Sequence, residues 1–265
     1  MKINYFCSYK RKYMRGLLIS IAIFITGISF SQEVLPANRD EVIKTIQKLA
    51  LENISRINPE KLTLGFSLSP SISWLTARHD DLSTDGATIA GSLAFHLAYE
   101  LSNHFSLTSG LFLGIQGGYL FDDASLNDPT TKNNFLQNYY TVEFPILARY
   151  STKPVNKVLY YAQGGVVPGF SLAATEFHQK STWANRNKRI NITTLSDPFL
   201  LSFQMGVGTS RKIWNNNAVF AEINFKTTMI NLASEDGYLN AARYSTIPVP
   251  VIHGGNMFFT FGLNF

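Results

Sequence analysis

The chain has 265 residues, of which 45% are hydrophobic, 13% aromatic and only 15% charged. This composition excludes a disordered chain, which needs many charges and few aromatic residues, and the single cysteine, Cys7, excludes a disulfide scaffold. The formal net charge of +5 would suggest nucleic acid as a partner, so the basic residues have to be located first.

Residues 1 to 31 have the pattern of a cleaved secretory signal peptide. A basic, acid-free start precedes a short apolar run at 17 to 30, and the small residues Ser29 and Ser31 favour cleavage before Gln32. An uncleaved anchor is the alternative, but the run is shorter than the ~20 residues of a membrane-spanning helix. Removing the five basic residues of this segment leaves 18 basic and 18 acidic residues. The mature chain is therefore neutral and cysteine-free, and we expect no nucleic-acid partner.

Residues 32 to 60 are predicted to form a periplasmic segment with one amphipathic helix. Apolar residues recur at three- and four-residue spacing between 38 and 56, Asn38 can cap the start, and Asn58-Pro59 ends the pattern. The polar face carries both signs of charge, which does not favour binding to an anionic membrane surface. Two interpretations of this helix remain. It packs against its own domain, or it binds a partner protein or the membrane surface.

From residue 61 onward the hydrophobic period changes from 3.6 to 2. Apolar residues alternate with small polar ones, as in a strand with two different faces. The pattern occurs eight times, at 62 to 74, 87 to 99, 105 to 119, 140 to 150, 158 to 172, 199 to 207, 219 to 225 and 257 to 265.

These features predict an all-β fold over residues 61 to 265, an eight-stranded antiparallel up-and-down transmembrane β-barrel. The non-apolar face is mostly Gly, Ser, Thr and Ala, whereas a water-exposed face would carry many charges. Long connections at 76 to 86, 122 to 138, 173 to 198 and 232 to 255 alternate with short ones, as in outer-membrane barrels. We expect the cell outer membrane, with periplasmic N- and C-termini. The number of strands becomes ten if residues 190 to 195 and 244 to 252 also cross the membrane.

Aromatic residues at both ends of the predicted strands are consistent with two interfacial girdles. Trp74 and Tyr140 belong to the loop side, and Tyr150 and Phe265 to the turn side. Pro145 lies within a predicted strand, where it cannot donate a ladder hydrogen bond. The apolar alternation continues across it, so we predict an inward-facing proline with a local bulge or a missing bond.

The segment 139 to 150, Tyr-Tyr-Thr-Val-Glu-Phe-Pro-Ile-Leu-Ala-Arg-Tyr, resembles the central strand of the PorT-like outer-membrane β-barrel family. The Gly164-Gly165 strand, the Gly206-x-Gly208 strand and the end of the chain are also similar to that family. The resemblance covers about residues 62 to 265 and implies an outer-membrane barrel. The family's namesake belongs to a secretion machine, which implies a secretion or envelope protein partner.

Three groups of residues are candidates for function, and none of them is catalytic, cofactor-binding or metal-binding. We expect a charge network in the lumen, because a buried charge needs a partner. The C-terminal strand resembles the signal that barrel assembly machinery recognises. Basic residues in the third long loop could contact phosphates of lipopolysaccharide. The lumen group is His96, Glu100, Glu143, Arg149, Glu222 and Lys226, the assembly group is Phe259, Phe261, Leu263 and Phe265, and the loop group is Lys180, Arg186, Lys188 and Arg189.

The sequence favours a non-enzymatic structural, assembly or secretion-associated barrel that contacts outer-membrane lipids. The alternative is a narrow channel or small-ligand binder that uses the Ser- and Gly-rich lumen, although side chains nearly fill an eight-stranded barrel. The cluster His79-Asp80-Asp81 is the one rim site that resembles a catalytic or metal constellation, and an acidic loop tip is more often simply solvated.

Overall fold

In the computed structural model, the described residues are 58, 61–78, 82–122, 134–179, 189–214, 217–234 and 250–265. The chain divides into two compact units, Met1–Lys61 and Leu62–Phe265. The predicted signal peptide and the predicted helix at 38 to 56 lie outside the described residues. Among the described residues, no helix is long and apolar enough to span a membrane.

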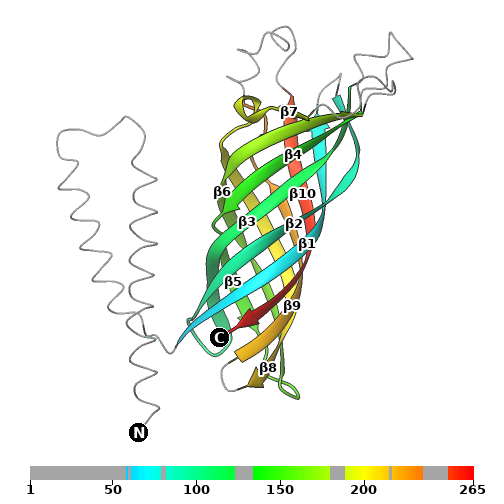
Figure 1. The fold of residues 1–265 in the computed structure, drawn as a ribbon. Helices are drawn as coiled ribbons and strands as arrows, with labels where there is room; N and C mark the ends of the chain where they lie inside the picture. The colour runs from blue at the N-terminus through cyan, green and yellow to red at the C-terminus, as the bar shows by residue number, and fades with distance from the viewer. Residues whose placement is uncertain are drawn as a thin grey trace, which may run out of the picture. The chain divides into compact units, whose positions relative to one another are not determined.

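The second unit is a closed antiparallel barrel (Figure 1). Each barrel strand pairs with its neighbours in sequence, and β1 pairs with β10 to close the ring. Closure leaves no open edge in this ring, so each ring strand has a hydrogen-bonding partner on both sides. The strands are β1 (Leu62–Arg78), β2 (Leu82–Glu100), β3 (Phe105–Asp122), β4 (Asn134–Glu143), β5 (Ile146–Ser151), β6 (Val158–Gln179), β7 (Arg189–Asn191), β8 (Phe199–Trp214), β9 (Asn217–Thr228) and β10 (Val251–Asn264).

The ring formed by the described strands has eight members, because β4 and β5 are two halves of one strand. They are separated at Phe144-Pro145, and both halves pair with β3 and with β6. Pro145 is buried and faces inward, and the backbone N–H of Phe144 still donates to Pro168. The strand is interrupted at Pro145 as predicted, whereas the nearby bulge lies on β6, where Leu172 is the extra residue.

The strands are longer than the alternating pattern predicted. β1 and β2 continue through most of residues 76 to 86, β4 begins at Asn134, β6 extends to Gln179, and β10 begins at Val251. All four predicted long loops are therefore shorter. Backbone pairing continues after the outward residues cease to be apolar; for example, Ala77 pairs with Ile252 and Leu82 pairs with Asp122. Of the two segments that would have raised the strand count to ten, 190–191 belongs to β7, which pairs only with β6, and 251–252 begins β10.

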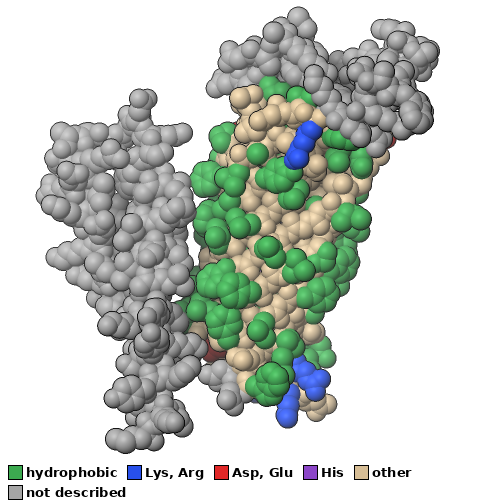
Figure 2. All heavy atoms as spheres, in the orientation of Figure 1, with side chains coloured by type: hydrophobic (Ala, Val, Ile, Leu, Met, Phe, Trp, Pro, Cys, Tyr) green, Lys and Arg blue, Asp and Glu red, His purple; other side chains and the backbone are tan. Residues whose placement is uncertain are grey.

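The two faces of the barrel have opposite character. Large apolar side chains such as Ile89, Leu93 and Val207 are exposed on the outside, and Figure 2 shows hydrophobic side chains over this face with basic ones toward its ends. Inward residues of the same strands are buried, among them Ser67, Ser69, Ser71 and Ser73 of β1. We call the end where 101–104, 152–157 and 215–216 connect the strands the turn end, and the opposite end the loop end.

Candidate functional site

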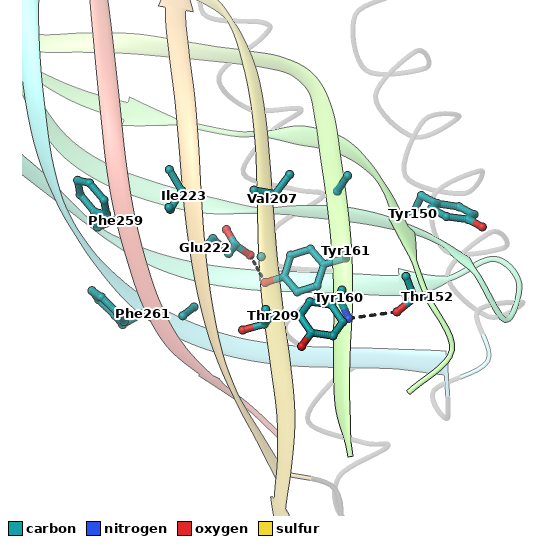
Figure 3. Close-up of a pocket in the computed structure, with 13 residues that line it drawn as sticks. Tyr150, Thr152, Tyr160, Tyr161, Val207, Thr209, Glu222, Ile223, Phe259 and Phe261 are labelled. Carbon is teal, nitrogen blue, oxygen red and sulfur yellow. Dashed lines mark hydrogen bonds between the residues drawn. The ribbon is translucent and has the colours of Figure 1, made fainter. Parts of the chain in front are cut away.

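The lumen contains a polar layer centred on the carboxylate of Glu222, on β9. The carboxylate accepts hydrogen bonds from Tyr161 Oη at 2.7 Å, Arg149 Nη2 at 2.9 Å and Gln163 Nε2 at 3.0 Å, all on β5 or β6. Figure 3 shows the Tyr161 hydroxyl directed at Glu222. Asn224 Nδ2 donates to the same carboxylate at 2.9 Å. Four donors therefore satisfy this buried charge, which compensates its loss of water.

A second ion pair lies next to this layer. Lys226 Nζ donates to both carboxylate oxygens of Glu143, at 2.6 and 2.7 Å, and Thr141 Oγ1 donates to Glu143 at 3.0 Å. Lys226 also lies 5.3 Å from the ring centre of Phe258. The side chains of Lys226 and Glu143 are only 4% and 7% exposed, so the pair is isolated from water.

His96 is buried and faces inward, but no hydrogen bond or ion pair between described residues joins it to the charges predicted to share its network. Its Nε2 lies 2.5 Å from Ser67 Oγ, and its ring packs edge-on against Phe112 and Phe220. The prediction that Glu100 belongs to the interior network is wrong, because this residue is exposed at the end of β2. Glu100 is the next inward position after Ala98 on β2, but it lies beyond the enclosed part of the lumen.

The loop end of the lumen is filled by an apolar core that the sequence did not predict. Side chains from the strands meet residues of the short helix Thr193–Leu195 and of the segment after β9. Backbone hydrogen bonds hold these segments together, from Asp197 N to Leu232 O and from Ser234 N to Leu195 O, both within 2.9 Å. The core consists of Leu75, Leu120, Phe135, Tyr139, Ala174, Ile192, Leu195, Leu200, Leu232, Ala233 and Ile252.

Glycines make room for the large side chains inside the barrel. Phe220 is paired in register with Gly262, and Tyr161 is paired with Gly208. A methyl group on Gly262 would lie 2.3 Å from Phe220 Cζ, and one on Gly208 would lie 2.7 Å from Tyr161. His96 likewise lies between Gly65 and Gly110 on its two neighbouring strands. At these positions, neighbouring rings occupy the space that the glycines leave.

The family model described as "Outer membrane protein beta-barrel domain" matches residues 56–233, which includes β1 to β9. The chain belongs to this outer-membrane barrel family. Its exposed apolar outer face is accordingly the surface that meets the lipid of the outer membrane. No curated protein matches the chain.

Several solved outer-membrane barrels are similar at low sequence identity. Neisserial surface protein A is 10% identical with a TM-score of 0.40, over 77% of this chain and 96% of that one. OprG from Pseudomonas aeruginosa is 9% identical with a TM-score of 0.40, over 77% and 96%. A major outer membrane protein from Thermus thermophilus is 12% identical with a TM-score of 0.40, over 76% and 99%.

The other predicted groups are the C-terminal strand, the third long loop and the rim cluster. Phe259, Phe261 and Leu263 are on the lipid face of β10, and Phe265 exchanges backbone hydrogen bonds with Leu64 at the seam with β1. Arg189 of β7 donates to the hydroxyl of Tyr140 and lies 5.7 Å from its ring centre. Lys180, Arg186, Lys188 and the cluster His79-Asp80-Asp81 lie outside the described residues. Within the described ranges, no group of three or more metal-ligating side chains is present.

Proposed function

We propose that this protein is a non-enzymatic, non-conducting outer-membrane barrel that acts as a structural or assembly component. The filled lumen carries the proposal. Two ion pairs and a polar layer occupy its middle, and an apolar core closes its loop end. An ion would have to displace paired buried charges and then cross an apolar barrier, and both steps are costly. The partner would bind outside the barrel wall, at the loops or at the segment 32 to 60.

Single-channel recording in planar bilayers tests this proposal. We expect no stable unitary conductance from the purified full-length mature chain. A matched variant, Leu75→Ser with Leu120→Ser, introduces polar groups into the loop-end core without changing the lipid face, and it reports whether the recording can detect a weakened barrier. Reproducible conductance steps from the wild-type barrel would contradict the proposal.

The alternative, a narrow channel or small-ligand binder, is supported by polar groups in the lumen that have no hydrogen-bond partner. Among the described residues these groups include Ser71 Oγ, Gln116 Nε2 and Asn256 Oδ1, all of them buried. Such groups would bind water or a small polar ligand. The recording above separates the channel from the structural barrel, because only a channel conducts.

We further propose that the turn end and both termini are periplasmic. Short connections at one end and longer ones at the other support this orientation, since outer-membrane barrels place short turns in the periplasm. After signal cleavage the chain has no cysteine, so single cysteines can be introduced cleanly. An impermeant maleimide should label Thr194→Cys on intact cells and Lys153→Cys only after permeabilisation. The reverse pattern would overturn the orientation.

The resemblance to PorT-like barrels supports a secretion or envelope protein as the partner. The basic residues Lys180, Arg186, Lys188 and Arg189 are proposed contacts for lipopolysaccharide phosphates. Alanine at all four positions should lower the lipopolysaccharide that co-purifies with the barrel, and an unchanged amount would contradict this contact. The segment 259 to 265 is proposed as the signal for barrel assembly machinery.

A further inference from the structure

The lipid face of the barrel has a groove of about 660 Å³ near the turn end, across β6, β8, β9 and β10 (Figure 3). Its floor is formed by the small side chains of Ala162, Thr209 and Ala221, together with Gly208. Tyrosines of β5 and β6 form one wall, and phenylalanines of β10 form the other. The wall residues are Tyr150, Tyr160, Phe259 and Phe261.

The strand register explains why this surface is hollow. One row of paired residues runs from Tyr160 through Thr209 and Ala221 to Phe261, so two small side chains separate two large rings. The next row toward the loop end runs from Tyr150 through Ala162, Val207 and Ile223 to Phe259. In both rows an aromatic ring stands at each end with smaller side chains between, and the result is a trough whose size is within the ~300–1,000 Å³ typical of ligand clefts.

A basic group lies at the turn-end mouth of this trough. Arg211 is the next outward residue after Thr209 on β8, about 7 Å further along the strand, and it is exposed. The exposed lysines Lys153 and Lys157 lie in the neighbouring turn. That turn is fixed beside the groove, because Val155 and Val158 exchange backbone hydrogen bonds and the N–H of Tyr160 donates to Thr152 Oγ1. No described acidic side chain forms an ion pair with Arg211.

We propose that the groove binds one acyl chain of an anionic phospholipid, whose phosphate is held by Arg211 and the lysines of the 152–157 turn. The groove is apolar and faces the lipid, which suits a hydrocarbon chain. Cations stand at its mouth, where the headgroup of a lipid in the same leaflet would lie, and arginine binds phosphate through paired N–H groups. Charge complementarity favours an anionic lipid over a zwitterionic one. Assignment to the periplasmic leaflet rests on the orientation proposed above, whereas the binding itself does not.

Native mass spectrometry of the folded full-length mature barrel tests this proposal, with phosphatidylglycerol and phosphatidylcholine of identical acyl chains as probes. We expect the wild-type barrel to retain one phosphatidylglycerol in preference to phosphatidylcholine. Arg211→Gln should weaken phosphatidylglycerol binding about tenfold, the loss of one charged hydrogen-bond partner. Ala221→Phe should fill the floor and weaken the binding of both lipids.

Two control variants make the same kinds of substitution, loss of a basic side chain and addition of a ring, at positions outside the groove. Lys212→Gln removes a charge from the adjacent position, whose side chain lies on the other face of β8, and Ala148→Phe adds a ring to another outward alanine. Both should bind like the wild type. Thr209→Leu is a milder filling variant that tests the groove if Ala221→Phe does not fold, as judged by heat-modifiable gel migration.

Three results would overturn the proposal. One is equal lipid retention by the wild type, Arg211→Gln and the filling variants. Another is that glycerol phosphate, which has no acyl chain, binds as tightly as phosphatidylglycerol. The third is loss of a barrel dimer in Ala221→Phe with lipid retention unchanged, which would assign the groove to a second copy of the chain.

Discussion

Lys226 Nζ on β9 contacts both carboxylate oxygens of Glu143 on β4, at 2.6 and 2.7 Å. Arg149 on β5 contacts Glu222 on β9 at 2.9 Å. Because β6 and β8 lie between these strands in the ring, both ion pairs cross the lumen and connect the same two walls. This arrangement links opposite walls of the barrel and resists its flattening.

Removing one member of the crossing pair should be strongly destabilising. Lys226→Met leaves the Glu143 carboxylate buried without its cation, and we expect the free energy of unfolding to fall by about 3–5 kcal/mol. Lys226→Met combined with Glu143→Met should restore most of the loss, because an apolar pair needs no charge compensation. Urea unfolding in lipid vesicles, followed by tryptophan fluorescence, measures both effects. Lys212→Met at the exposed turn end is the control, with an expected change of at most about 0.5 kcal/mol. A small loss for Lys226→Met would show that water reaches the pair.

The pairing of glycines with large rings gives a second prediction. Gly262→Ala places a methyl group against the Phe220 ring and 2.5 Å from the carbonyl oxygen of Phe66. We expect the free energy of unfolding to fall by about 1–3 kcal/mol, the usual effect of overpacking. Gly164→Ala is the matched control, since the closest atom to the added methyl group would be 3.7 Å away. Equal effects of the two substitutions would indicate that replacing glycine in a strand lowers the stability through the backbone and not through contact with the Phe220 ring. In the Phe220→Ala background, Gly262→Ala should lower the free energy of unfolding less, because the clash with the ring is absent.

The alternation of residues predicted the barrel, its eight members and the direction of most side chains, because a period of two determines which face each residue occupies. It did not predict which side chains fill the lumen. Phe112 and Phe258 face inward but stand beside outward apolar residues, so a run such as Leu111-Phe112-Leu113 looks simply apolar in the sequence. The ion pairs join residues 73 and 83 positions apart, and only the ring order of the strands brings them together. The loop-end core depends on segments that lack a strand pattern.

The lipid-facing assignment predicts a dependence on depth in the membrane. Leu113 lies near the middle of β3 on the outer face, and Leu107 lies near the turn end of the same face. Leu113→Arg should lower the free energy of unfolding by about 2–4 kcal/mol, and Leu107→Arg by at most about 1 kcal/mol, because the arginine near the interface keeps contact with water. Unfolding in vesicles measures both. Similar values for the two variants would contradict the predicted position of the bilayer along β3.

Phe265 distinguishes a role in assembly from a role in packing. Its ring lies 5.8 Å from that of Phe66, and its backbone pairs with Leu64 whatever its side chain. Phe265→Ala should therefore change the free energy of unfolding by about 1 kcal/mol or less, the scale of one half-exposed ring contact, while lowering the yield of folded barrel in the outer membrane. Phe105→Ala removes another exposed turn-end ring, which packs 5.1 Å from Tyr150, and should leave assembly unchanged. Heat-modifiable migration of pulse-labelled protein measures the assembly rate in cells. If both variants assemble at the wild-type rate, Phe265 serves only the aromatic girdle.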